Sequence, residues 1–167
     1  MRSCRTGIPA TCSIEVRGAY ERVLNLLRAA DSSGSWPASS QARQKVITES
    51  SLVEKGSRGG TFSVGFLPAP LSQPKGNELF PELLLACFQL EKILYPSRTP
   101  SSTIAVNRHA QFRPHRDTGA GSGQTTSLIV ALGDFAGGEL MVECKANDIR
   151  YSPVEMDGWG QRHWTLP

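Results

Sequence analysis

Apolar residues recur every three or four positions in two long stretches of the chain, which is the spacing of an amphipathic helix. The first stretch covers residues 14 to about 30, and Ser13 stands where a helix N-cap is expected. The second covers residues 78 to 95, with Pro81 in a first turn that tolerates proline. We expect both helices to cover one side of a β core. The apolar face of the second helix is broad and comprises Leu79, Leu83, Leu84, Ala86, Cys87, Leu90 and Leu94.

The segment between these helices predicts a short helix, a strand and a proline-rich connection. Ser39 or Ser40 is expected to cap a helix that ends near residue 49. Residues 61–67 alternate between apolar and small or polar side chains, which is typical of a half-buried strand. The apolar side chains of that strand, expected on one face, are Phe62, Val64 and Phe66.

After residue 100 the pattern changes to short β segments separated by glycine-rich turns. Strands after helices indicate an α+β protein, and we expect a jelly-roll core with the N-terminal helices packed on one side. We divide the chain into a disordered lead (1–12), a helical support region with one strand (13–100) and a partial catalytic core (101–167). The core strands are predicted at 103–108, through the His115 to Asp117 segment, and at 126–132, 139–143, 149–154 and 163–165.

Length and composition fit one intracellular domain. The chain has 167 residues, a net charge of +3, 16 glycines and 11 prolines, a balance that favours loops and turns over a helical bundle. The four cysteines show no C-x-x-C spacing, which argues against a zinc knuckle and a disulfide framework and favours a reducing compartment. No apolar run approaches a membrane span, and the N-terminus lacks the apolar core of a secretory signal. The mild positive charge permits contact with nucleic acid without arguing for it.

Three side chains form a candidate metal site. His115 and Asp117 are two residues apart, so on an extended strand they project to the same face. The chain has three histidines, and His163 lies where a glycine-broken turn leads into a short aromatic strand. Two histidines and one carboxylate on one face of a metal leave other positions open, as in non-haem Fe(II) oxygenases. The rival carboxylate, Asp157, precedes a glycine and is better explained as a turn residue.

The order of these features resembles the double-stranded β-helix core of the Fe(II)/2-oxoglutarate-dependent dioxygenases. In that superfamily a His-x-Asp pair, a Gly-Gly-x-Leu hairpin and a distal histidine follow one another, as His115, Asp117, the 137–140 hairpin and His163 do here. The triplet starting at Asn107 is similar to the Asn-x-Tyr strand of the branch that includes nucleic-acid demethylases, with His109 in place of the tyrosine. The resemblance therefore implies that Asn107 and His109 contact the cosubstrate.

One expected feature of the superfamily has no counterpart in this sequence. A basic residue, usually arginine, stands about one strand beyond the distal histidine and pairs with the far carboxylate of 2-oxoglutarate. Only four residues follow His163, so we expect the core to be incomplete at the C-terminus and the chain to be a fragment. The sequence selects no replacement among Arg113, Arg116, Arg150 and Arg162.

The resemblance implies an oxygenase that binds Fe(II), 2-oxoglutarate and O2, and it allows for ascorbate. The reaction would be hydroxylation or oxidative demethylation of a protein side chain, a small molecule or a nucleic-acid base. A prolyl or lysyl hydroxylase fits the triad as well as a nucleic-acid base oxygenase does. The contrasting hypothesis is a catalytically inactive or truncated jelly-roll module that binds a ligand without turnover. Neither the substrate nor the oligomeric state follows from the sequence.

Overall fold

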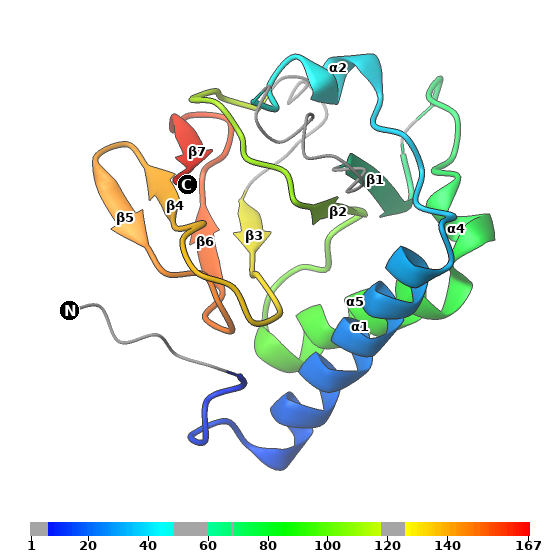
Figure 1. Ribbon diagram of the computed structural model, residues 1–167, viewed down its shortest axis with the longest axis vertical. Coiled ribbons are helices and arrows are strands. Elements are labelled where there is room, and N and C mark those ends of the chain that lie inside the picture. The colour runs from blue at the N-terminus through cyan, green and yellow to red at the C-terminus, as the bar shows by residue number, and fades with distance from the viewer. Residues whose placement is uncertain (1–6, 49–59, 68, 118–125) are drawn as a thin grey trace.

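A computed structural model describes residues 7–48, 60–67, 69–117 and 126–167. It confirms the α+β class: two long helices lie side by side, and short strands gather beyond them in three small antiparallel sheets (Figure 1). The sheets do not close into a barrel within the described residues. The jelly-roll arrangement of the core therefore stays a prediction. Among the described residues, no helix has the length and apolar character needed to cross a membrane.

Helix α1 spans Ile14–Ser32 and begins where the sequence predicts. The Ser13 hydroxyl accepts a hydrogen bond from the Val16 backbone N–H at 3.2 Å, so one of the unpaired donors of the first turn is satisfied. Tyr20 and Val23 of the predicted stripe are buried, and α1 packs against α5. The prediction for this helix is confirmed, with an end two residues beyond Ala30.

The second long helix is interrupted at its start, contrary to the prediction of one helix over residues 78–95. Helix α4 spans Gly76–Leu79, and α5 spans Pro81–Leu94. Phe80 between them has φ −138° and ψ 60°, because a proline disfavours helical backbone in the residue before it. Leu79 consequently leaves the apolar face and is 50% exposed, whereas Leu83, Ala86, Cys87 and Leu90 are buried as predicted.

Helix α2 spans Gln41–Gln44 and is shorter than predicted. The Ser40 hydroxyl caps it by accepting a hydrogen bond from the Arg43 N–H at 3.4 Å, as expected for a serine at this position. The chain then becomes extended, and Ile47 forms an antiparallel bridge with Phe112. The predicted end of this helix, near residue 49, lies outside the described residues.

The first sheet joins β1 (Gly60–Gly65) to β2 (Thr103–Arg108) in antiparallel register. The predicted range of β2 is confirmed. Phe62 and Val64 of β1 are buried as predicted, but Phe66 is 58% exposed. Gly65 has φ +105°, a conformation that side chains disfavour, and it ends the alternation before Phe66.

The main hydrophobic core lies between this sheet and the helices. Val106 of β2 and Phe62 and Val64 of β1 share one face of the sheet and belong to the same buried cluster as Leu83 of α5. Residues of the predicted support region and of the predicted catalytic region thus share one core. Of the predicted lead, residues 1–6 lie outside the described residues, and Ile8 and Cys12 pack against this core.

The remaining strands are short. Strands β3 and β6 pair with each other, and β4 lies between β5 and β7. The predicted strand over 149–154 is wrong over residues 149–153, which form a single bridge from Arg150 to Ala131 and include Tyr151 with φ +51°; β6 begins only at Val154. The strand β5 was not predicted, because its sequence Lys-Ala-Asn has little apolar alternation. The observed bounds are β3 Ser127–Ile129, β4 Leu140–Val142, β5 Lys145–Asn147, β6 Val154–Met156 and β7 His163–Thr165.

Candidate metal centre

Backbone pairing brings the three candidate ligands together from two distant parts of the chain. His115 N donates to the His163 carbonyl at 3.1 Å, and His163 N donates back to the His115 carbonyl at 2.9 Å. Two residues on, Asp117 N donates to the Gly158 carbonyl at 2.9 Å. The predicted strand through His115 is thus reduced to one antiparallel bridge, but that bridge is enough to align the site.

The donor atoms of the three side chains lie close to one another. One ligand atom each from His115, Asp117 and His163 falls within 4.8 Å of the other two. His163 Nε2 is 3.8 Å from Asp117 Oδ1, and the two imidazole centroids are 4.4 Å apart. His163 is 6% exposed, and the other two are half-buried. The structure therefore brings together the three residues that the sequence pattern selects.

Both imidazoles are held with the same nitrogen turned to the backbone. His115 Nδ1 lies 2.7 Å from the Arg113 carbonyl oxygen, and His163 Nδ1 lies 3.1 Å from the Gln161 carbonyl oxygen. A carbonyl oxygen only accepts hydrogen bonds, so each Nδ1 carries the proton when the ring is neutral. Each Nε2 then keeps its lone pair. This tautomer, fixed by a backbone acceptor, is the one in which histidine binds a metal through Nε2.

The donor set fits a divalent first-row metal. Donors at right angles around such an ion, with bonds of about 2.1 Å, lie roughly 3 Å apart. The present spacing of up to 4.8 Å contracts to that value by small side-chain rotations. Two neutral imidazoles and one carboxylate leave a positive net charge on the ion and leave coordination positions open.

Burial lowers the pKa of His115 below its ordinary value. The loss of hydration is the largest cause, and the nearby His163 and Arg43 act in the same direction. The hydrogen bond to the Arg113 carbonyl and the charge of Asp117 oppose the shift. His115 therefore stays neutral, and able to bind a metal, to a lower pH than a solvated histidine does.

This shift predicts a pH dependence of stability in the metal-free protein. The unfolded chain protonates His115 near its ordinary pKa, whereas the folded chain resists protonation until a lower pH. The free energy of unfolding should thus decrease as the pH falls below about 6.5. Denaturant titrations of the wild type and of His115→Gln between pH 5 and 7.5 measure the difference. A parallel decline in both proteins would contradict the assignment to His115.

Gly158 makes room for the Asp117 carboxylate. A Cβ atom at residue 158 would lie 2.5 Å from Asp117 Oδ2 and 2.9 Å from Ser127 Oγ, closer than van der Waals contact allows. The turn before His163 therefore requires a residue without a side chain where it passes the carboxylate. This requirement links the glycine of the Asp-Gly turn directly to the candidate metal centre.

The substitution Gly158→Ala should weaken metal binding about 10- to 100-fold, the range seen when groups that orient ligands are disturbed. The methyl group would displace the Asp117 carboxylate from its position. Isothermal titration of Mn(II) into the metal-free protein gives the affinity. Gly18→Ala is the matched control, because a Cβ at that helical position has nothing within 4 Å. Unchanged affinity in the first variant would show that the carboxylate does not hold the metal.

Asn107 and His109, the two residues expected to contact the cosubstrate, do not belong to the candidate ligand group. Asn107 is exposed, and its amide oxygen accepts a hydrogen bond from Thr61 Oγ1 at 2.8 Å. It lies on the face of β2 opposite buried Val106, away from the helical core. His109 is exposed with φ +48° and does not join the candidate ligand group. The role of both residues stays a prediction.

Sequence reasoning missed Arg43, which acts on the site from helix α2. The extended chain after α2 pairs with the segment before His115: Arg113 N donates to the Val46 carbonyl at 2.7 Å. This pairing brings α2 beside the site, and the charge of Arg43 contributes to the lowered pKa of His115. No local signal predicts a contact between segments more than 60 residues apart in the sequence.

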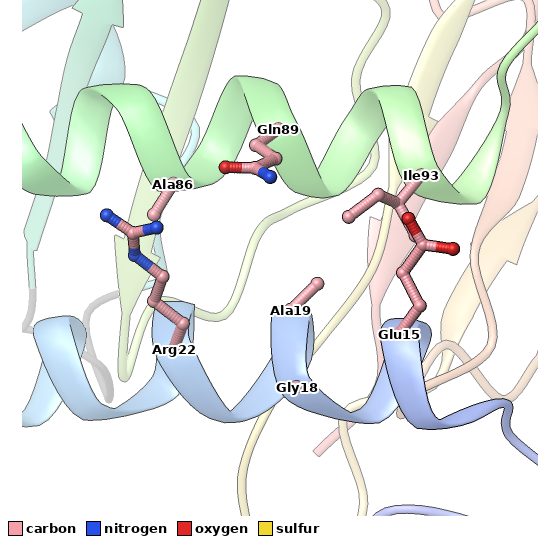
Figure 2. A pocket seen from close by; sticks show the side chains of 7 residues that line it. All are labelled: Glu15, Gly18, Ala19, Arg22, Ala86, Gln89 and Ile93. Atoms are coloured by element: carbon pink, nitrogen blue, oxygen red, sulfur yellow. The ribbon is translucent and has the colours of Figure 1, made fainter.

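A surface groove on the helical side of the molecule is separate from this centre. It runs between α1 and α5, where the small residues Gly18, Ala19 and Ala86 line it (Figure 2). Glu15 and Arg22 flank it from α1, and none of its lining residues comes from the strands and turns of the triad (Figure 2). The groove contains no pair of metal-binding side chains, so it does not compete with the triad as a metal site.

No protein-family model, curated protein or solved structure matches this chain. What the site can do is therefore inferred from its donor atoms and from the groups around them.

Proposed function

We propose that this protein is an Fe(II)- and 2-oxoglutarate-dependent oxygenase. The observation that carries the proposal is the convergence of two imidazoles and one carboxylate, with both Nδ1 atoms engaged by backbone carbonyls. The three side chains supply three donor atoms close together, so the metal requires no fourth protein ligand. A protein that only binds a metal can use a closed set of four ligands. A reaction with O2 and a second substrate needs open coordination positions on the metal.

The residues have separate tasks in this proposal. His115 and His163 would hold the metal through Nε2, and Asp117 would offset part of its charge. Fe(II) and 2-oxoglutarate, when bound, would supply the oxidative chemistry that hydroxylates or demethylates the substrate. The burial of His163 would shield one side of a bound metal from water, and Gly158 leaves room for the carboxylate.

The fold that we propose for the core is the double-stranded β-helix. Three features support it. The segment containing His115 and Asp117 runs antiparallel to the strand that begins with His163. Val106, Phe62 and Val64 pack with the long helices on one face of the β1–β2 sheet, and the alternation of the strand places Asn107 on the other face. The strand that begins with His163 continues into the sheet of β4 and β5.

We propose Arg43 as the cation that pairs with the far carboxylate of 2-oxoglutarate. A dianionic cosubstrate requires a positive group near the metal, and guanidinium binds carboxylates with two parallel hydrogen bonds. Arg43 forms no ion pair within the described residues, and it stands three residues before Val46, whose carbonyl pairs with Arg113 N on the segment that leads to His115. Asn107 is a further candidate contact, from the face of β2 that the helices leave free.

The test is anaerobic addition of Fe(II) and 2-oxoglutarate, separately and together, followed by visible absorption. The proposal expects a weak metal-to-ligand charge-transfer band that requires both additions. Arg43→Gln should weaken 2-oxoglutarate binding at least tenfold while Fe(II) binding stays unchanged, because an ion pair is lost but no metal ligand. Fe(II) binding without the band would leave a metal-binding module without turnover. No Fe(II) binding would overturn the proposal.

A further inference from the structure

Trp159 is an exposed aromatic residue on a hydrogen-bonded turn. Its side chain is 49% exposed, although a tryptophan usually buries most of its large apolar surface. The Asp157 carboxylate accepts hydrogen bonds from Trp159 N at 3.1 Å and Gly160 N at 2.8 Å. Gln161 closes the turn by donating its N–H to the Asp157 carbonyl at 2.8 Å. These hydrogen bonds hold the backbone of the turn that carries the exposed indole ring.

The turn that carries Trp159 lies at the edge of the candidate metal centre. Trp159 directly follows Gly158, whose carbonyl binds Asp117 N and whose Cα lies against the Asp117 carboxylate. It precedes His163, the first residue of β7, by four residues. A flat group stacked on the indole would thus lie beside the metal ligands.

Two arginines stand next to the same ligands. Arg116 lies between His115 and Asp117, and Arg162 directly precedes His163. Arg116 follows His115 and Arg162 precedes His163, so both lie on the same side of the antiparallel bridge between the histidines. Both side chains are exposed, and neither forms an ion pair within the described parts of the chain. Like charges close to one another repel, so an anion bound near both arginines would be favourable.

The neighbouring acidic groups are already engaged by backbone N–H groups. The Glu143 carboxylate accepts a hydrogen bond from Arg162 N at 2.7 Å, and the Asp157 carboxylate holds the turn. Arg116 and Arg162 each adjoin a histidine ligand and both are exposed, so an anion held by them would lie beside the metal ligands.

We propose that this surface binds single-stranded nucleic acid, with a base stacked on Trp159 and phosphates at Arg116 and Arg162. An aromatic platform next to guanidinium groups is the combination that single-strand binding uses, because every base has a flat face and every linkage has a charge. A single strand also leaves a neighbouring base free to enter the metal site, which a stacked duplex does not. Single-stranded nucleic acid would be the substrate class of the proposed oxygenase. The reaction rests on that proposed function, whereas the binding does not.

The test measures binding to the metal-free full chain, so that it does not depend on the oxygenase reaction. Fluorescence anisotropy of a labelled 12-nucleotide single-stranded DNA and RNA of mixed sequence gives the affinity between 50 and 200 mM salt. Trp159→Ala should weaken binding roughly tenfold, and Trp159→Phe should restore most of it. The double variant Arg116→Gln, Arg162→Gln should reduce the slope of log affinity against log salt by roughly 1.4.

The matched control is the double variant Arg22→Gln, Arg28→Gln, which removes the same charge from exposed positions of α1. An equal loss of binding in the control would overturn the inference, as would equal affinity for a duplex or for a labelled polyglutamate peptide. Absence of binding at 50 mM salt would also overturn it. If the charge-transfer band forms but nucleic acid does not bind, the oxygenase proposal stands alone. Binding without the band would leave a nucleic-acid-binding protein.

Discussion

His115→Ala and His163→Ala are each expected to reduce Fe(II) affinity by more than about 100-fold, a loss larger than that caused by disturbing groups around the ligands. Each substitution removes one of two imidazole donors and leaves a site of two ligands. The charge-transfer band should disappear in both variants. Equilibrium dialysis against Fe(II) under anaerobic conditions, with Mn(II) as a redox-stable substitute, measures the change in affinity.

His109→Ala provides the matched control for these two substitutions. His109 is exposed and does not join the candidate ligand group, so its removal should leave Fe(II) affinity unchanged within about a factor of two. The same variant tests whether His109 contacts the cosubstrate, since that role would weaken the 2-oxoglutarate response alone. Equal loss of Fe(II) binding in all three histidine variants would mean that the metal binds adventitiously.

Glu91→Ala is expected to lower the free energy of unfolding by about 3 kcal/mol. Glu91 is 8% exposed at the C-terminal end of α5, where it pairs with Arg98 and accepts hydrogen bonds from Ser101 N at 3.1 Å and Ser101 Oγ at 2.7 Å. Its removal leaves the largely buried Arg98 guanidinium with less compensation for its charge. Urea denaturation followed by circular dichroism measures the change.

The same ion-pair network connects the helices to the β3–β6 sheet. Arg98 also donates to Glu155 of β6 at 2.7 Å and to the Thr126 carbonyl at 2.8 Å. The matched control is Gln89→Ala, an exposed position on the same helix, which should change stability by no more than about 0.5 kcal/mol. If Glu91→Ala were no more destabilising than this control, the network would contribute only surface electrostatics.

The helices could be predicted because their signals are local. The Ser13 cap and the apolar stripe of α1 depend on residues within a few turns of one another, and both appear as expected. The break at Phe80 also has a local cause in Pro81, but the apolar periodicity continues across it and conceals it. The strands were placed less well, since a three-residue strand such as β5 is defined by its partners.

The candidate site was likewise predicted only in part. His115, Asp117 and His163 were selected from residue type and order, and the structure places their donor atoms together. Arg43 and Trp159 were not selected. The segment after Arg43 pairs with a distant segment that leads to His115, and the exposure of Trp159 is a property of the folded surface.

The sequence by itself determined the helix-forming segments, the α+β class and the three residues that meet at the candidate metal centre, because residue spacing and residue chemistry carry that information. Only the tertiary structure decided how they meet: the backbone pairing that brings His115 to His163, and the glycine that admits the Asp117 carboxylate. These features arise from contacts between segments far apart in the chain. Such contacts depend on backbone register and packing, which local patterns do not encode.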